Sequence, residues 1–510
     1  MRRLVAAGAL AFVAAACVGP SFREPNPEAP ADWRPTPAVA DTLRPFYDSL
    51  RAHRDTEPLE PAAPAPSSDT TREMPARVQD TTANLAWFDL LIDPELRKLV
   101  ETSLRENRDL KVAVAAVLEF RAQLASTRGN FFPQITGNGV AGRTKTTFGS
   151  LGAFTFNQIQ LTANLNWELD VWGRIRRATE AARADLLGQE ENQRAVVLSL
   201  VGSVASAYLQ LRQLDLQLEI SRRTLDANRE TLRLARRRFS EGVISELDVR
   251  QFESEVASPA ASVAQFEGQI VQAEDQLSVL VGRNPAGIPR GRVLPEVLGS
   301  LKLPEFLPSS VLDRRPDVRL AKAQLHAAVA RIGAAEANLF PTFTVVGDYG
   351  TYSPNTSGLF KSRSEIYQIL GEVSVPIFTG GVVGKQVDVA RARADQARYG
   401  YQQAVLTALR EVEDGFASVR STRNQVAAQQ TQVDALRRAL TLAQRRYESG
   451  LSSYLDLLDA QRSLFSAELS LAQAQGAEAT AAVTLYQALG GGWPVVPGDT
   501  LPVDRPPPPR

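Results

Sequence analysis

The chain has 510 residues and no formal net charge, because 57 basic side chains balance 57 acidic ones. This balance argues against a nucleic-acid-binding protein, which needs a basic excess or a basic stripe. With two histidines and one cysteine, the chain offers no intrachain disulfide, no Cys/His zinc cluster and no Cys–His nucleophilic pair. Serine elbows and phosphate-binding glycine loops are also missing from the sequence. We therefore expect no enzyme, no cofactor and no metal site.

The N-terminus has the pattern of a bacterial lipoprotein signal. Two arginines precede an apolar stretch that is too short to span a bilayer, and small residues then lead to Cys17. We expect residues 1–16 to be cleaved as a signal peptide and Cys17 to be acylated, since several acyl chains anchor a protein stably. The alternative is an ordinary secretory signal with an incidental cysteine, because Ala14 stands where lipoprotein signals usually carry leucine.

Proline-rich segments flank the body of the chain. Residues 17–84 hold repeated prolines and few large apolar side chains, which excludes a packed helix there. We predict an extended or disordered tether for this segment. Residues 493–510 form a similar tail.

The body of the chain is an internal duplication. The matched residues all recur 208 positions apart: Asp109 and Asp317, Asn130 to Pro133 and Asn338 to Pro341, Gly242 and Gly450, Asp248 and Asp456, Gly282 and Gly490. One constant offset over so long a stretch indicates two copies of a supersecondary unit. We place the first copy at residues 85–300 and the second at 301–492.

Each copy begins with an amphipathic, alanine-rich helix, predicted over Leu110–Thr127 and Val318–Asn338. Each helix ends at a Phe-Pro pair, because the residue before proline is pushed out of the helical region. The strands that follow therefore begin near Pro133 and Pro341.

Two strands per copy are predicted, at about residues 133–171 and 341–378. From Ile159 to Leu169, apolar and polar side chains alternate strictly over eleven residues, which is the period of a strand. A weaker alternation runs from Tyr367 to Ile377, with the partner strands near 134–143 and 342–352. A soluble half-buried sheet has the same pattern. The strand length and the aromatic residues near strand ends favour transmembrane strands, with transitions to helix at Gly173 and Pro376.

Very long helices follow the strands. No proline occurs between Gly173 and Gly242, or between Gly381 and Gly450, and each stretch of 68 residues reaches about 100 Å as a helix. This length predicts coiled-coil or helical-barrel packing, with a sharp turn at each second glycine. Pro259 lies in the helix after the first turn and is expected to kink or break it.

Four transmembrane strands cannot close a barrel, and an open edge in lipid leaves backbone groups unpaired. Two copies of the chain would supply eight strands, which side chains fill, whereas three would supply twelve around an aqueous lumen. The expected fold class is therefore mainly α with a membrane β part. If the strands are transmembrane, a conduit favours the trimer, with a twelve-stranded barrel continued by a long α-helical barrel.

The sequence resembles the TolC-like outer-membrane efflux proteins, in particular the NodT-type lipoprotein branch that serves resistance-nodulation-division (RND) pumps. The matching motifs are Cys17-Val18-Gly19-Pro20, Asn130-Phe131-Phe132-Pro133, Trp167-Glu168-Leu169-Asp170-Val171-Trp172-Gly173-Arg174, Arg314-Arg315-Pro316-Asp317, Tyr454-Leu455-Asp456-Leu457-Leu458-Asp459 and Ala488-Leu489-Gly490-Gly491-Gly492-Trp493. The resemblance implies a homotrimer in outer-membrane lipid that crosses the periplasm. It also implies docking to a periplasmic adaptor and an inner-membrane RND pump, with passive exit of small molecules such as drugs.

The resemblance also assigns roles at the two helical turns. By this likeness the adaptor contacts are Gly242, Val243, Gly450, Leu451 and Ser452, the pore constriction is Leu455, Asp456 and Asp459, and the closure latch is Asp248, Tyr447 and Arg462. The glycines have a simpler explanation as turn residues, and the aspartates as helix-start residues. Arg462 is expected to pair with Asp459, either in a neighbouring chain or three residues away in one helix.

Other functions remain open from the sequence. A periplasmic adaptor also has long helical hairpins, but it has one hairpin rather than a duplicated one. The duct of a type I protein secretion system shares the fold, and Cys17 with the Gly490–Trp493 ending favours the efflux branch by analogy. The sequence does not name the exported substrate.

Overall fold

The computed structural model describes residues 19–22, 93–147, 152–299, 314–449 and 451–491. The predicted signal peptide, the acylation site Cys17, most of the proline-rich tether and the C-terminal tail lie outside these ranges. Gly450, at the second turn, lies outside them as well.

Both copies of the duplicated unit have the same order of elements. The first copy comprises α4 (Pro94–Glu106), α5 (Arg108–Gly129), β1 (Gln134–Thr147), β2 (Ala153–Leu169), α6 (Arg174–Ser240) and α7 (Glu246–Val281). The second comprises α9 (Pro316–Ala337), β3 (Thr342–Ser353), β4 (Glu365–Ser374), α10 (Val382–Glu448) and α11 (Tyr454–Ala488), with the short α8 (Leu294–Gly299) between the copies. The long helices α6 and α10 both have 67 residues and begin 208 positions apart.

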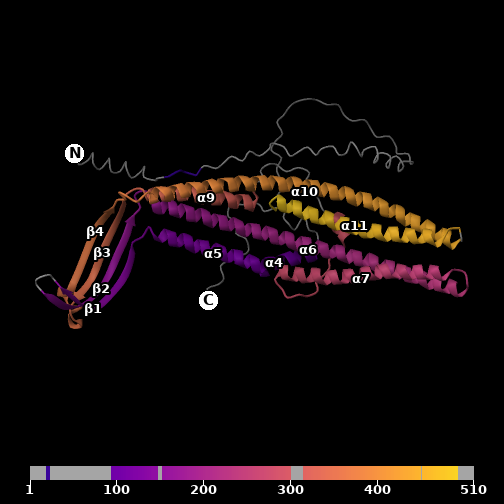
Figure 1. Cartoon of the computed structure of the whole chain (residues 1–510), viewed down its shortest axis with the longest axis horizontal. Helices are drawn as coiled ribbons and strands as arrows, with labels where there is room; N and C mark the ends of the chain where they lie inside the picture. Colours follow the sequence, from indigo (N-terminus) through magenta and orange to yellow (C-terminus); the bar gives the residue numbers. More distant parts are fainter. Residues whose placement is uncertain (1–18, 23–92, 148–151, 300–313, 450, 492–510) are drawn as a thin grey trace, which may run out of the picture.

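The molecule is elongated, with its strands at one end and its helical turns at the other (Figure 1). Near the strands, α5, α6, α9 and α10 run side by side. Toward the far end, α7 pairs with α6, and α11 pairs with α10. A helix of 67 residues is about 100 Å long, so α6 and α10 each extend from the sheet to the turns.

The helix ends follow from their residues. The long helices begin at Gly173 and Gly381, both in the left-handed region with φ of 82°, which glycine adopts without steric cost. Asp93 caps α4 by accepting from the backbone N–H of Glu95 at 2.8 Å. The predicted helices before the Phe-Pro pairs are confirmed as α5 and α9, with ends within two residues of the expected ones.

Pro259 was expected to kink or break its helix, and the break does not occur, because α7 runs without interruption from Glu246 to Val281. Proline cannot donate to the carbonyl four residues earlier, which is that of Glu255. In this fold the Asn228 side-chain amide of α6 donates to that carbonyl at 2.8 Å. The missing backbone donor is thus replaced from the neighbouring helix, and Pro259 itself is buried.

The four strands form one antiparallel sheet in the order β1-β2-β3-β4. The strands predicted around Ile159–Leu169 and near 342–352 are confirmed, as β2 and β3. The fourth strand is shorter than predicted, because β4 ends at Ser374, opposite the first residue of β3. Pro376, two residues further on, has no N–H to extend the ladder.

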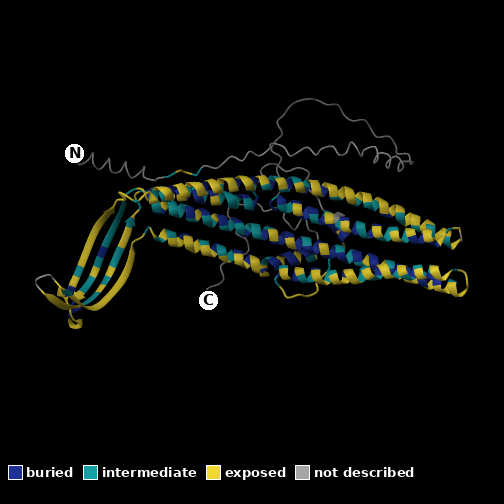
Figure 2. Cartoon of the chain, in the orientation of Figure 1, coloured by how far each residue is buried: buried dark blue, intermediate teal, exposed yellow. Residues whose placement is uncertain are grey.

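The two faces of this sheet differ in polarity. Because the register pairs residues directly across strands, Leu161, Leu165, Trp167, Tyr349 and Ile369 all share one face. The opposite face carries mostly polar residues: Thr136, Asn138, Gln160, Thr162, Asn164, Asn166, Thr344, Asp348, Gln368 and Glu372. The apolar face is largely uncovered within the chain, as Figure 2 shows for the outer strands.

The main hydrophobic core surrounds the middle of α6. Tyr208 is fully buried there, and its hydroxyl donates to Asp93 Oδ2 at 3.0 Å while accepting from the backbone N–H of Gly291 at 2.8 Å. Among the described helices, α6 alone has an apolar 18-residue window long enough to cross a membrane, and 56% of that window is buried. The burial identifies this window as part of the core.

Candidate functional site

The first turn joins α6 to α7 at the end of the molecule furthest from the sheet (Figure 1). Gly242 has φ of 73°, and the N–H of Val243 donates back to the carbonyl of Arg238 at 2.9 Å. This is the left-handed closure typical of a helix C-terminus. Ser245 and Asp248 then form a capping box that starts α7. The tight turn leaves the Val243 side chain exposed at its tip.

The second turn joins α10 to α11 with the same local geometry. The N–H of Leu451 donates to the carbonyl of Arg446 at 2.8 Å, which matches the Val243 contact in the first copy. Leu451 is exposed, whereas the Ser452 hydroxyl is buried without a hydrogen-bond partner among the described residues. Each tip therefore exposes one apolar side chain next to its turn.

The three residues assigned to the constriction lie on one side of α11. Leu455, Asp456 and Asp459 are all exposed, while Leu457 and Leu458 on the other side are buried. The helical spacing expected from the sequence is therefore present. Within one chain, this leaves an apolar side chain and two carboxylates free to face neighbouring chains.

No hydrogen bond or ion pair joins the three latch residues to one another. The Asp248 carboxylate accepts from the N–H and hydroxyl of Ser245, both at 2.9 Å. Tyr447 packs edge-on against Tyr454, with ring centroids 6.2 Å apart. Arg462 pairs with neither Asp248 nor Tyr447.

Within the chain, Arg462 pairs with Glu255 and not with Asp459 of its own helix. Its Nε donates to Glu255 Oε1 at 2.8 Å, so the ion pair joins α11 to α7. The pair between Arg462 and Asp459 within one helix is therefore not formed. Glu255 is buried, which makes it the carboxylate that the guanidinium neutralises most effectively.

Sequence reasoning missed the aromatic residues beneath this ion pair. Phe252 of α7 and Tyr454 of α11 pack with ring centroids 3.8 Å apart, inside a cluster that also contains Leu232 of α6. Burial raises the pKa of Tyr454, because the phenolate would lose its hydration. The only signal in the sequence was apolar spacing on each helix, which does not show which helices meet.

A second buried carboxylate, Glu468 of α11, joins the two hairpins further from the tip. Its Oε2 accepts from Arg223 of α6 at 2.6 Å, and its Oε1 accepts from Arg437 of α10 at 2.8 Å. Glu255 and Glu468 therefore both hold α11 through arginine contacts. Each carboxylate is much less exposed than the arginines that meet it.

At the other end of the molecule, indole hydrogen bonds hold the strand-to-helix transitions. Trp167 Nε1 donates to the carbonyl of Phe131 at 2.9 Å, immediately before the predicted transition at Pro133. Trp172 Nε1 donates to the carbonyl of Pro341 at 2.7 Å, and its ring stacks on Phe340. The Trp172 hydrogen bond thus joins the first copy of the repeat to the second where the sheet meets the helices.

The short segment Gly19–Phe22 packs against the helices near this junction. The carbonyl of Gly19 accepts from Arg177 of α6 at 3.1 Å, and Phe22 stacks on His326 of α9 with ring centroids 4.5 Å apart. Gly19 lies so close to Gly333 of α9 that a Cβ on Gly19 would fall 2.3 Å from the Gly333 Cα. Only glycine fits this contact, so the segment is held two residues after Cys17.

A family model described as outer membrane efflux protein matches residues 99–283 and 307–491 of this chain. The chain belongs to this family. The two matched ranges are offset by 208 residues (307 minus 99, and 491 minus 283), which is the internal repeat seen in the sequence. The chain is therefore an outer membrane component of an efflux system, and its family consists of efflux channels.

Individual relatives agree with this assignment. The solvent efflux pump outer membrane protein SrpC of Pseudomonas putida is 37% identical over 79% of this chain and 86% of its own length. The cation efflux system protein CusC of Escherichia coli strain K12 is 32% identical over 85% of this chain and 94% of its own length.

Solved structures in the family have the same fold. The open-state crystal structure of the Neisseria gonorrhoeae MtrE outer membrane channel superposes with a TM-score of 0.77 at 30% identity, covering 93% of this chain and 98% of that one. A crystal structure of CusC gives a TM-score of 0.76 at 32% identity, covering 83% of this chain and 99% of that one. These neighbours are mostly helical channels with a small sheet, like this chain.

Proposed function

We propose that three copies of this chain form a passive exit duct through the outer membrane. The observation that carries the proposal is the two-faced sheet, whose edge strands β1 and β4 have no partner on their outer sides among the described residues. An open edge in lipid costs several kcal/mol for each unpaired backbone group. Pairing β4 of one copy with β1 of the next removes both edges and closes a barrel of twelve strands around a polar lumen.

The polarity of the sheet sets its orientation in this barrel. The face with Leu161, Trp167 and Ile369 contacts lipid, and the face with Asn164, Asp348 and Gln368 lines the lumen. Below the membrane, α5, α6, α9 and α10 of three copies continue the wall as a helical barrel across the periplasm. The duct supplies no chemistry and requires no cofactor.

The far end of the duct is the gate in this proposal. Threefold symmetry brings three copies of Leu455, Asp456 and Asp459 together as an apolar ring and two carboxylate rings, which favour cations over anions. The closed state is held by the buried Glu255–Arg462 and Glu468 contacts, together with the packing of Tyr447 on Tyr454. Asp248 supports this arrangement by starting α7 in a fixed position.

The exposed tips dock a periplasmic adaptor that connects the duct to an inner-membrane RND pump. Val243 and Leu451 offer apolar contacts, Gly242 and Ser452 lie beside them in the two turns, and Gly450 is the remaining adaptor contact in this proposal. Small molecules are the exported class, since relatives are named for solvent, toluene and cation efflux. Selection takes place at the pump, and protein secretion is the less favoured alternative.

Acylated Cys17 anchors the chain beside its own barrel. The contacts of Gly19 with Arg177 and Gly333, close to the start of α6, hold the N-terminal segment at the level where the strands leave the membrane. Changing Cys17→Ser should abolish incorporation of radiolabelled palmitate. Continued labelling of the serine variant would exclude Cys17 as the acylation site.

The orientation of the sheet is tested by two neighbouring substitutions on β4. Ile369→Lys places a charge on the proposed lipid face near the middle of the strand, at a cost of about 2–4 kcal/mol for each copy. Gln368→Lys, one residue away, places the same charge on the lumen face. We expect the first variant to lose heat-resistant trimers from outer-membrane fractions and the second to retain them.

The functional readout is drug resistance in a host that lacks its own duct but carries a matching adaptor and pump. The unmodified chain and Gln368→Lys should restore resistance, whereas Ile369→Lys should not. Equal trimer yields for both lysine variants would contradict the proposed orientation of the sheet.

A further inference from the structure

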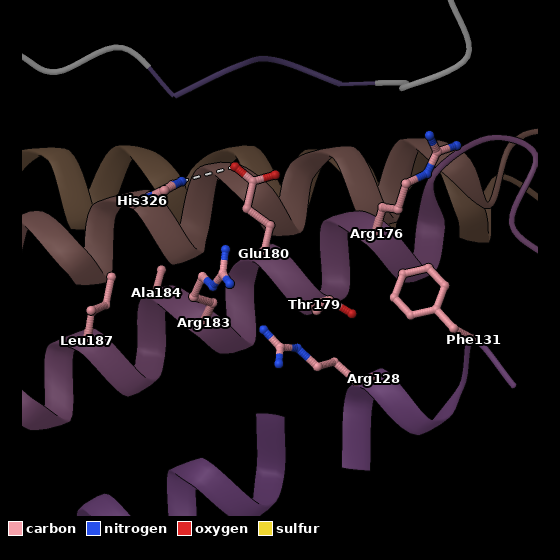
Figure 3. Close-up of a pocket in the computed structure, with 9 residues that line it drawn as sticks. All are labelled: Arg128, Phe131, Arg176, Thr179, Glu180, Arg183, Ala184, Leu187 and His326. Atoms are coloured by element: carbon pink, nitrogen blue, oxygen red, sulfur yellow. Dashed lines mark hydrogen bonds and ion pairs between the residues drawn. The ribbon is translucent and has the colours of Figure 1, made fainter. Parts of the chain in front are cut away.

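A basic pocket of about 440 Å³ lies beside the strand-to-helix junction, between the end of α5 and the start of α6. Its lining includes Arg128, Arg183, Thr179 and Phe131, with His326 contributed by α9. Figure 3 shows the side chains of Arg128 and Arg183 extending into the same space, with Thr179 beside them. The pocket therefore presents two guanidinium groups and a hydroxyl to one small volume.

These groups have no protein partner among the described residues. The side chains of Arg128 and Arg183 form no hydrogen bond or ion pair there, and the Thr179 hydroxyl oxygen is buried without a hydrogen-bond partner. Both arginine residues are exposed to solvent, whereas a buried hydroxyl without a partner costs free energy. An anion that accepts hydrogen bonds from all three side chains removes this cost and pairs with both charges.

The other charged groups of the pocket are already paired. Glu180 accepts from Arg177 at 2.8 Å and lies 3.0 Å from His326 Nε2. Arg176 pairs with Asp170, whose carboxylate also accepts backbone N–H groups at the start of α6. The unpaired charge that remains is that of Arg128 and Arg183.

The second copy of the repeat provides an internal comparison. Adding 208 to Arg128 and Arg183 gives Glu336 and Arg391, which form a salt bridge at 2.8 Å between α9 and α10. The first copy therefore has arginine where the second has the partner carboxylate. The same offset of 208 places Val387, which is buried and apolar, at the position of Thr179, whose hydroxyl has no hydrogen-bond partner among the described residues.

The neighbouring α5–α6 contact shows that this helix pair can form ordinary ion pairs. Arg121 of α5 pairs with Glu190 of α6 at 3.3 Å, two turns further from the sheet. Arg128 and Arg183 lie nearer the sheet than this ion pair. Unlike Glu336–Arg391 in the second copy and Arg121–Glu190 on the same two helices, they include no carboxylate.

We propose that this pocket binds the phosphate of an anionic glycerophospholipid from the inner leaflet of the outer membrane. The proposal rests on the outer-membrane placement argued above. Thr179 and Arg183 lie six and ten residues after Gly173, or about 9 and 15 Å along the helix from the sheet. Arginine side chains at this depth extend toward the headgroup layer.

The pocket wall is shared with the segment that leads to the proposed lipid anchor. His326 lines the pocket and stacks on Phe22, so the pocket lies next to the face on which the N-terminal segment packs. Phe131, which also lines the pocket, accepts from Trp167 on the apolar face of the sheet. Lipid can therefore reach the pocket from the membrane, with its acyl chains along that apolar face.

The test compares phosphatidylglycerol binding by three forms of the purified full chain in detergent. Arg128→Glu recreates the carboxylate–arginine pair of the second copy, so this variant should fold while losing the anion site. Arg283→Glu makes the same charge change at an exposed loop position after α7, where Arg283 has no ion pair among the described residues, and serves as the control. Native mass spectrometry measures the lipid retained, and thermal unfolding measures stabilisation by added lipid.

We expect Arg128→Glu to weaken phosphatidylglycerol binding about 10- to 100-fold, as loss of charge-assisted hydrogen bonds does. The unmodified chain and Arg283→Glu should bind it equally, and phosphatidylcholine with the same acyl chains should bind more weakly. Equal retention by all three forms would overturn the proposal. Full displacement of the lipid by millimolar inorganic phosphate would show a simple phosphate site and would overturn the lipid assignment.

Drug resistance in the same strains separates this proposal from the duct itself. If the unmodified chain restores resistance but Arg128→Glu keeps its lipid, the pocket assignment fails and the duct stands. If the unmodified chain neither enters the outer membrane nor restores resistance, the duct fails.

Discussion

Replacing Arg462 with alanine should release α11 from α7 and open the closed end of the duct. The Glu255 carboxylate is 9% exposed and the Arg462 side chain 59% exposed, so the ion pair is buried on one side only. Breaking a fully buried pair costs about 3–5 kcal/mol, and an exposed pair contributes about 0–1 kcal/mol. We therefore expect the closed arrangement of each copy to lose about 1–2 kcal/mol, because a buried carboxylate is left without its cation.

A change of this size shifts the equilibrium between closed and open tips about 5- to 30-fold for each copy. If the three copies of a trimer act independently, the closed state of the whole trimer loses about 3–6 kcal/mol. The assay is single-channel recording in planar bilayers, where Arg462→Ala should raise both open probability and mean conductance. Glu255→Gln should do the same, and combining the two changes should add little to either alone.

The control for this experiment is Arg250→Ala in the same tip. Arg250 pairs with Glu246 and Glu253 on its own helix, and its exposed contacts do not join the two hairpins. We expect the open probability and the mean conductance of this variant to equal those of the unmodified chain. Unchanged conductance in Arg462→Ala would refute the argument that the Glu255 contact holds the gate shut.

Three further predictions concern charge, core packing and pH. Asp456→Ala combined with Asp459→Ala should reduce cation selectivity and raise conductance in planar bilayers, and unchanged currents would count against the gate assignment. Tyr208→Phe should lower the free energy of unfolding by about 1–3 kcal/mol, seen as a lower melting temperature, because the Asp93 carboxylate loses a buried donor. Burial raises the pKa of Glu191 above its ordinary 4.5, so the folded state binds the proton more tightly than the unfolded state. The stabilisation of the fold by the proton on Glu191 is complete below pH 4.5. It is lost as the pH rises through the pKa that Glu191 has in the folded state. Glu191→Gln should therefore gain in melting temperature relative to the unmodified chain between pH 4.5 and neutrality, and parallel pH curves would contradict this sign.

Much of the fold could be predicted because it depends on rules that act over a few residues. The strict alternation from Ile159 to Leu169 indicates a strand, and the Phe-Pro pair at Pro133 ends a helix through a steric clash with the preceding residue. Gly242 closes its turn with a positive φ, as expected for the end of a helix. Each of these patterns acts locally, so no knowledge of distant packing was needed.

The partners of charged and polar side chains could not be predicted in the same way. Of the two pairings expected for Arg462, the one with Asp459 three residues away in the same helix is not formed, and within the chain Arg462 meets Glu255, which is 207 residues away in the sequence. The continuity of α7 through Pro259 likewise depends on Asn228 of another helix. Such contacts depend on the axial offset between packed helices, and no local pattern encodes that offset.

The sequence alone determined the duplication, the extent of the two long helices and the position of the strands before each of them. These features follow from local geometry, because side-chain periodicity and turn glycines act over a few residues. The tertiary structure decided which carboxylates hold the hairpins together, and it brought Arg128 and Arg183 to one pocket whose carboxylate, Glu180, pairs with other residues. The physical reason is that helix propensity is a property of nearby residues, whereas an ion pair requires two distant segments to pack in one particular register.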